Sequence, residues 1–291
     1  MEEFLNLFLN TLQHDKGYAP NTVMAYRNDL TQFLDFAHNA RPALTQWAHV
    51  DKLLLTSFAT HLTERYYTPA SIARKLAVLK SFFHFLVARQ LLAADPTTDL
   101  GSPKVEKPTP QILNADEITR LLAAPSQNHT PKGLRDRAML ELLAANGLRV
   151  SELVALDVDD LNLPMLTMNC AGRGNRRRVL PLHPLTAETL TQYLERARPA
   201  LTTDPAEHAL FVNPRGARLT RQGLWLVIKE YVQEAGVAAS ITPHMLRHSF
   251  AVHLLNRGEK LERVQHWLGH ASATTTQVYT RLADSLAHRA E

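Results

Sequence analysis

The sequence lacks most features that mark secreted, membrane-bound or metal-binding proteins. Its 291 residues include one cysteine, Cys170, which cannot form an intrachain disulfide or anchor a cysteine-based zinc site. No apolar run approaches the length of a membrane span. The first residues, MEEFLNLFLN, are acidic where a signal peptide would be basic. These absences predict a cytoplasmic protein with no membrane partner.

Histidine is frequent, but its spacing does not favour a metal site. His244 and His248 are four residues apart, as are His266 and His270, and this spacing can present two ligands on one helix face. The chain contains no HExxH motif, and neither pair has a carboxylate or cysteine in a matching motif. We therefore predict no bound metal and no cofactor.

A large excess of charge is also missing, since 32 basic residues face 28 acidic ones and the net charge is +4. The basic excess is concentrated in GRGNRRR, residues 172–178, where Arg173, Arg176, Arg177 and Arg178 share one short turn. Clustered arginines suit contacts with phosphates. A basic turn that only improves solubility would have the same composition.

The hydrophobic pattern is mainly helical and divides the chain into three parts. Residues 1–92 carry amphipathic helical stripes and predict a small helical bundle. Residues 93–109 are rich in proline and poor in hydrophobic residues, which is typical of a linker. Residues 110–291 form a second domain, which begins with a capping-box pattern at Asn114 and Glu117.

The second domain contains one island of strand pattern. The segments LTMNC (166–170) and RVLPL (178–182) flank a glycine-containing turn and predict a β-hairpin with the arginine cluster at its tip. From Leu219 onward the pattern is helix after helix. The predicted fold class is therefore mainly α, in two domains, with a small β-hairpin in the second.

The start of one helix in this domain gathers positive potential. In ITPHMLRHSFAVHLL, residues 241–255, Thr242 offers a capping oxygen and Pro243 occupies the first helical position. His244 and Arg247 follow one turn apart, so both project from one face near the positive end of the helix. This arrangement predicts that an anion docks there.

Several short motifs together resemble the tyrosine site-specific recombinases. They are GLRVSEL with Arg149, HMLRHSFA with His244 and Arg247, LGH with His270, and TTTQVYT with Tyr279, in the order and separations of that family. The segment GYAPNTVMAYRNDLTQFLDF near the start resembles the amino-terminal core-binding domain of the same family. The resemblance covers nearly the whole chain and looks most like the Xer branch.

This resemblance implies a SAM-like core-binding bundle followed by a catalytic domain. It also implies that DNA is cut and rejoined through a covalent 3′-phosphotyrosyl intermediate, without a high-energy cofactor. Tyr279 would be the nucleophile, since a phenol with a pKa of about 10 can attack phosphorus and later leave. Arg149 and Arg247 would clamp the phosphate through fork-shaped hydrogen bonds, assisted by His244 and His270.

One position departs from the family pattern. Members usually carry a lysine at the hairpin tip that protonates the departing 5′-oxygen, whereas this chain has Arg173 and no lysine between Lys132 and Lys229. Arginine is a poor general acid but can stabilise a negatively charged oxygen. Arg173 could act electrostatically, another group or water could supply the proton, or cleavage could be slow. We favour the first of these.

The resemblance further implies that both domains close on duplex DNA, with phosphate contacts from the helix at 71–89 and from the hairpin. A merely solvated helix face would show the same charges. The predicted DNA contacts are Arg74, Lys75, Lys80, Arg176, Arg177 and Arg178.

The family also implies an assembly of four subunits on two DNA duplexes. The tail carries Leu282 and Leu286 on one stripe, which would dock on a neighbouring subunit or fold back on its own domain. The tetramer would be homomeric or would include a second Xer-type recombinase, and a DNA translocase would be its activator.

Four functions remain open at this level. The leading one is a recombinase that resolves chromosome dimers at cell division, and the runner-up is the integrase of a phage, integron or transposon with the same chemistry. A type IB topoisomerase shares the tyrosine chemistry without pairing DNA sites. A DNA-binding module that has lost catalysis is conceivable because of Arg173.

Overall fold

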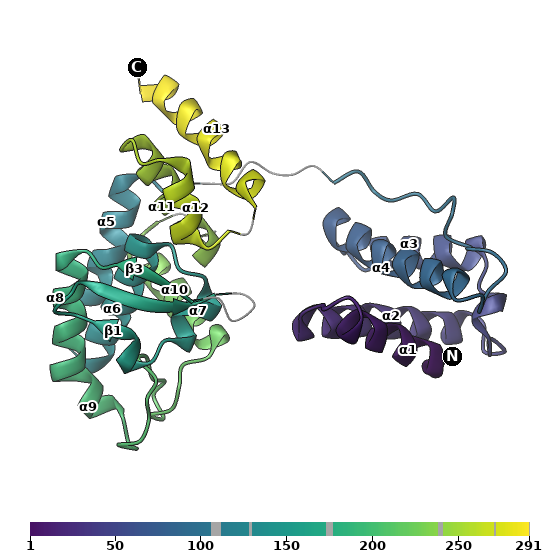
Figure 1. Cartoon of the computed structure of the whole chain (residues 1–291), viewed down its shortest axis with the longest axis horizontal. Coiled ribbons are helices and arrows are strands. Elements are labelled where there is room, and N and C mark those ends of the chain that lie inside the picture. The colour runs from purple at the N-terminus through teal and green to yellow at the C-terminus, as the bar shows by residue number, and fades with distance from the viewer. Residues whose placement is uncertain (106–111, 128–129, 173–176, 238–240, 271, 291) are drawn as a thin grey trace. The chain divides into compact units, whose positions relative to one another are not determined.

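The computed structural model of the chain describes residues 1–105, 112–127, 130–172, 177–237, 241–270 and 272–290. The chain divides into two compact units, Met1–Pro108 and Thr109–Glu291, called here the N-terminal and C-terminal units (Figure 1). The described residues are mainly helical, with one small sheet in the C-terminal unit. The predicted fold class is confirmed.

The N-terminal unit is an all-helical bundle around an aromatic core. Its helices begin where the sequence supplies caps: Asp51 accepts from the Leu54 amide at 2.8 Å, and Thr68 precedes Pro69 and accepts from the Ser71 amide. Buried aromatic rings fill the centre in edge-on and stacked pairs. Its elements are α1 (Glu2–His14), α2 (Pro20–Ala40), the 3₁₀ turn η1 (Trp47–His49), α3 (Lys52–Glu64) and α4 (Pro69–Ala88).

This core extends beyond the predicted domain end at residue 92. Leu100 lies within the segment predicted as a linker, yet it is buried and packs with the N-terminal core. The first part of residues 93–109 therefore belongs to the N-terminal unit. The sequence did not predict this, because Leu100 is a single apolar residue in a proline-rich segment.

A buried ion pair joins α2 to α4 and overturns one predicted DNA contact. Asp29 accepts from Lys75 Nζ at 2.8 Å and also pairs with Arg74, and Lys75 Nζ donates to Gln32 at 2.6 Å. The prediction that Lys75 faces DNA is wrong, because its side chain is only 9% exposed and serves the buried carboxylate. Arg74 remains half exposed and Lys80 is partly buried on the same helix.

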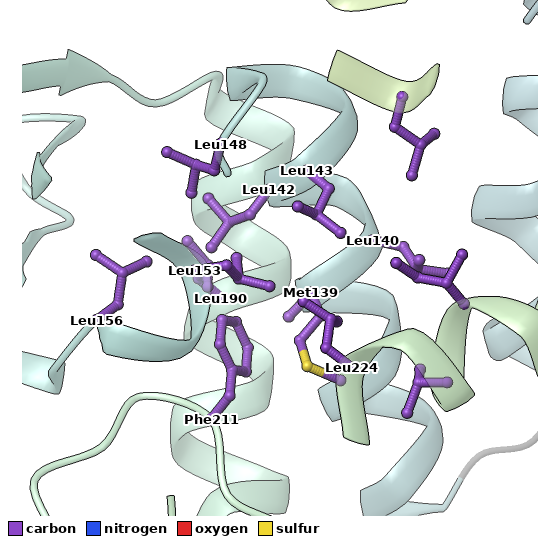
Figure 2. Packing of buried hydrophobic residues seen from close by; sticks show 14 of the residues in the cluster. Met139, Leu140, Leu142, Leu143, Leu148, Leu153, Leu156, Leu190, Phe211 and Leu224 are labelled. Carbon is purple, nitrogen blue, oxygen red and sulfur yellow. The ribbon is translucent and has the colours of Figure 1, made fainter. Parts of the chain in front are cut away.

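The C-terminal unit is built around α6 (Pro131–Asn146), whose side chains are buried on several faces. Figure 2 shows Met139, Leu140, Leu142 and Leu143 of this helix within the cluster, among leucines from neighbouring elements. The elements before the sheet are α5 (Ala115–Ala123), η2 (Ala124–Gln127), α6, α7 (Val150–Ala155) and η3 (Val158–Asp160). Those after it are α8 (Pro184–Gln192), the π-helical turn η5 (Tyr193–Ala197), α9 (Arg198–Leu201), α10 (Arg221–Glu234), α11 (Pro243–Asn256), α12 (Leu261–Leu268) and α13 (Ala273–Ala290).

The predicted hairpin is confirmed and is part of a three-stranded antiparallel sheet in the order β1–β2–β3. The strands are β1 (Leu161–Asn162), β2 (Thr167–Ala171) and β3 (Arg177–Pro181). Cys170 pairs with Arg178 and Met168 with Leu180, and the alternation of the strands buries all four of these side chains. Residues 173–176, with Arg173 and Arg176, lie outside the described residues.

Three C-terminal helices form a separate small core that carries the candidate site. The helices α11, α12 and α13 pack against one another (Figure 1). Phe250 of α11, Leu268 of α12 and Tyr279 and Leu282 of α13 are buried together in this core. The beginning of the tail helix therefore packs on its own unit through Leu282, whereas the side chain of Leu286 lies outside the described residues.

Candidate active site

Two helix ends hold the guanidinium of Arg247 in a buried position. Arg247, on α11, is 4% exposed and donates through Nη1 to the carbonyl of Gly147 and through Nη2 to the carbonyl of Leu268. Both carbonyls lie at C-terminal helix ends, which carry partial negative charge. The helices α6 and α12 stop there because Gly147 and Gly269 adopt left-handed φ values of 58° and 61°.

The turns that follow α6 and α12 also place Arg149 and His270 close to Arg247. Arg149 follows the Gly147 cap, and its Nη2 donates to the Gly269 carbonyl at 3.0 Å. His270 follows Gly269 directly, and its Nε2 lies 3.0 Å from Arg247 Nη2. Gly269 ends α12, and the turn that it forms brings Arg149, Arg247 and His270 together from three distant stretches of sequence.

A buried carboxylate that the sequence analysis did not select organises this cluster. Glu152 accepts from Arg149 Nη1 at 2.7 Å and from the Arg149 amide at 2.8 Å. It also accepts both Nη groups of Arg178 at 3.0 Å, and Arg247 Nη1 lies 3.8 Å away. The signal for it was present in GLRVSEL, where Glu152 stands three residues after Arg149 as in a capping box.

The electrostatics of the cluster leave positive charge in excess, since three guanidiniums face one carboxylate. Burial alone would raise the pKa of Glu152, but hydrogen bonds from Arg178 and from the Arg149 amide outweigh it and hold that pKa below its ordinary value. Burial, reinforced by the charge of Arg149, lowers the pKa of Arg247 to about 10, so the guanidinium is still charged at neutral pH. An anion is the complementary ligand.

The hairpin contributes to this network in a way that corrects another prediction. Arg178 was expected to contact DNA, but it is 8% exposed, pairs with Glu152 and donates to the Trp267 carbonyl at 2.9 Å. The strand alternation turns Arg178 inward and leaves Arg177, with a 70% exposed side chain, on the opposite face. The prediction for Arg178 as a DNA contact is wrong.

The phenol of Tyr279 reaches the cluster from α13. Tyr279 is 4% exposed, and its ring lies 6.2 Å, centroid to centroid, from the nearly parallel ring of His270. Its Oη lies 2.7 Å from Nδ1 of His248, a residue that the sequence analysis considered only as half of a metal pair. Burial raises the pKa of Tyr279 despite the opposing charges of Arg247 and Arg149, so the phenol is protonated at neutral pH.

The histidines differ in exposure and in partners. His270 Nδ1 lies 2.9 Å from Thr276 Oγ1, and burial together with the charge of Arg247 lowers the pKa of His270 to about 4. His244 is exposed at the start of α11, where Thr242 caps the helix as predicted. Its ring stacks on that of His248 with centroids 6.4 Å apart.

The described residues hold no group of three or more histidine, cysteine or acidic side chains placed to bind a metal ion. Within the same residues, no helix is both long and apolar enough to cross a bilayer.

A buried tyrosine beside a cluster of guanidiniums suits an enzyme that breaks and reseals phosphodiester bonds through a protein–DNA link. Residues 111–285 match the phage integrase family, and residues 5–90 match the phage integrase N-terminal SAM-like domain. The chain belongs to the phage integrase family, and it is a tyrosine recombinase of the Xer branch, an enzyme that cuts and rejoins DNA at specific sites.

Relatives extend the likeness over nearly the full length. The chain is 45% identical to tyrosine recombinase XerC of Roseiflexus sp. (strain RS-1), over 97% of this chain and 90% of the relative. It is 39% identical to tyrosine recombinase XerD of Staphylococcus epidermidis (strain ATCC 35984), over 98% of this chain and 96% of the relative.

Solved structures share the fold. The crystal structure of XerA recombinase matches with a TM-score of 0.56 and 27% identity, over 99% of this chain and 96% of that one. The post-cleavage complex of the XerH site-specific recombinase on palindromic difH substrate matches with a TM-score of 0.75 and 21% identity, over 99% and 94% of the two chains.

Proposed function

We propose that Tyr279 attacks the scissile phosphate and becomes linked to the 3′ side of the broken DNA strand. In this step the Tyr279 oxygen–phosphorus bond forms, the phosphorus–O5′ bond breaks, and the 5′-oxygen leaves as a hydroxyl. The reverse reaction with a different 5′ end rejoins the strands. The observation that carries the proposal is the Gly269 turn, which places His270 against the Tyr279 ring while binding Arg149 and lying beside Arg247.

The guanidinium cluster, formed by Arg149, Arg178 and Arg247 around Glu152, fits the negative charge that develops on the phosphate in this reaction. Arg149 and Arg247 would donate to the non-bridging oxygens, and Glu152 fixes their orientation without neutralising both. Arg149 is the more accessible of the two, with a third of its side chain exposed. His270, whose Nε2 lies 3.0 Å from Arg247 Nη2, would help orient the transition state through that guanidinium. The exposed His244 would contact the phosphate from the start of α11.

The leaving oxygen would be served by Arg173, which lies outside the described residues. Because arginine holds its proton, Arg173 would stabilise the departing oxygen by charge, and water would supply the proton.

DNA would be gripped by both units. On the N-terminal unit we propose phosphate contacts from Arg74 and Lys80, and on the C-terminal unit from Arg177 and from Arg176, which lies outside the described residues. The relatives solved on DNA include XerH on its difH substrate, which supports a double-stranded recombination site as the ligand of this chain as well.

The active assembly would be a tetramer on two duplexes. The relatives comprise both XerC and XerD proteins, which supports either a homomeric tetramer or one shared with a second Xer-type recombinase. A DNA translocase would act as the activator. The part of α13 beyond Leu282 is the segment that would contact the neighbouring subunit.

The cellular role would be the resolution of chromosome dimers in the cytoplasm before division. The similarity to XerC and XerD proteins over almost the whole chain supports this role over that of a mobile-element integrase. The test is chromatin immunoprecipitation of the protein followed by sequencing. We expect one major site near the replication terminus, and sites flanking a phage, integron or transposon would instead assign the second role.

A further inference from the structure

The nucleophile proposed above has a hydrogen-bonding neighbour to which no role has been given. Among the described residues, His248 is the hydrogen-bonding partner of Tyr279 Oη, with Nδ1 at 2.7 Å and ring centroids 5.4 Å apart. His248 follows Arg247 on α11 and is half-buried. It is therefore fixed by the same helix that places the phosphate-binding guanidinium.

The protonation states of the two side chains show which one donates in this hydrogen bond. The phenol is protonated at neutral pH because burial raises the pKa of Tyr279. Burial, together with the nearby His244 and Arg247, lowers the pKa of His248, so its ring is neutral under the same conditions. The phenol therefore donates to Nδ1 of a neutral imidazole.

The other histidines are not placed to take that proton. Arg247 Nη2 carries only hydrogens, so the His270 Nε2 facing it must accept, and the His270 Nδ1–H then donates to Thr276. Both nitrogens of His270 are thereby engaged. His244 is exposed to solvent, and its ring stacks on His248, the partner of Tyr279.

We propose that His248 is the general base of strand cleavage and the general acid of strand rejoining. During cleavage the Tyr279 oxygen bonds to phosphorus while its proton moves to His248 Nδ1, and the departing 5′-oxygen takes a proton from water, which leaves a hydroxide. During rejoining the new 5′-hydroxyl attacks phosphorus and gives its proton to hydroxide, which restores water, while the imidazolium returns its proton to the leaving phenolate. The inference rests on the proposed function, because it requires Tyr279 to be the nucleophile.

Two substitutions separate proton transfer from positioning. His248→Asn keeps an acceptor oxygen near the place of Nδ1 but cannot take up a proton, and His248→Ala removes both functions. His266→Ala is the matched control, since His266 is an exposed histidine on α12. The assay is single-turnover cleavage, from pH 6 to 9.5, of a nicked suicide duplex built on the chromosomal site that coprecipitates with the protein.

We expect both His248 variants to cleave about 10²- to 10⁴-fold more slowly at pH 7, the usual range for loss of a general base. Their deficit should shrink about tenfold per pH unit above neutrality, because the phenol then ionises without help. The control should match the parent protein throughout. Cleavage by His248→Asn at the parental rate, or a deficit that does not change with pH, would overturn the inference.

A second substrate identifies the side of the reaction. A 5′-bridging phosphorothiolate leaves as a thiolate and needs no proton, so a defect on the nucleophile side should persist with it. If the thiolate substrate instead restored the His248 variants, His248 would act on the leaving group and the inference would fail. The proposed function fails separately, if the parent protein forms no adduct or if Tyr279→Phe still forms one.

Discussion

Glu152 accepts both Nη groups of Arg178 at 3.0 Å while holding Nη1 of Arg149 at 2.7 Å. A hairpin arginine that is almost fully buried thus fixes the carboxylate that orients a guanidinium of the proposed active site. Because Arg178 also donates to the Trp267 carbonyl in α12, it ties β3, α7 and α12 together.

Replacement of Arg178 should therefore damage both stability and catalysis. We expect Arg178→Met to lower the free energy of unfolding by about 3 kcal/mol, the lower end of the range for breaking a buried ion pair, since Arg149 still faces Glu152. Urea denaturation measures this, and Arg177→Ala on the exposed face is the control, expected to change stability by less than about 0.5 kcal/mol. Equal effects of the two substitutions would contradict the assigned network.

A substitution at Gly269 tests the packing of Arg178 against the turn that follows α12. A Cβ at Gly269 would lie 2.9 Å from Arg178 Nη1, whereas one at Gly236, with a similar φ of 59°, would meet no atom of the described residues within 4 Å. Gly236→Ala should cost only the left-handed backbone penalty of about 1–2 kcal/mol. Gly269→Ala should cost about 1–3 kcal/mol more because of the added crowding and should also slow cleavage. If both alanine substitutions lowered the free energy of unfolding by similar amounts, Arg178 would be able to move away from the new Cβ without a loss of stability.

Local signals sufficed to predict the helix start at Thr242 and the hairpin, because capping and turn chemistry act between residues close in sequence. The resemblance to the tyrosine recombinases, through motifs in register, selected Arg149, Arg247 and His270, which meet at the Gly269 turn. Charge and the family resemblance predict Lys75 and Arg178 as DNA contacts. The sequence does not indicate that these two side chains are buried in ion pairs with Asp29 and Glu152.

The site residues that were overlooked have the same explanation. Glu152 and His248 acquire their importance from Arg178 and Tyr279, which lie 26 and 31 positions away along the chain. The periodicity of hydrophobic residues along a helix or strand does not predict contacts between residues so far apart. The place of Leu100 in the N-terminal core was hidden in the same way by its polar and proline-rich surroundings.

The neutral state of His270 gives a prediction for pH dependence. Its folded-state pKa of about 4 lies below the ordinary value of 6.5, so the unfolded chain binds the proton more readily. His270 should therefore make the free energy of unfolding fall as the pH drops from about 6.5 to 4, with no further loss below that. Urea denaturation at pH 7.5 and 5 should show a smaller fall for His270→Gln. An NMR titration of His270 with a midpoint near 6.5 would be inconsistent with its burial beside Arg247.

The arginine at the hairpin tip can be tested with the same two substrates used for His248. Arg173→Lys would place a proton donor where the family usually has one, so cleavage of an ordinary phosphodiester should accelerate. With a 5′-bridging phosphorothiolate, whose leaving group needs no proton, the two proteins should cleave at similar rates. Unchanged cleavage of the ordinary substrate would indicate that position 173 has little influence on the leaving group.

The central claim is that Tyr279 becomes covalently joined to DNA within the guanidinium cluster. The most direct measurement is to trap the protein on a nicked suicide duplex, digest the complex with protease and nuclease, and locate the nucleotide-bearing peptide by mass spectrometry. We expect the 3′-phosphate on the peptide containing Tyr279, and no adduct with Tyr279→Phe. An adduct on another residue, or one that survives the phenylalanine substitution, would contradict the account.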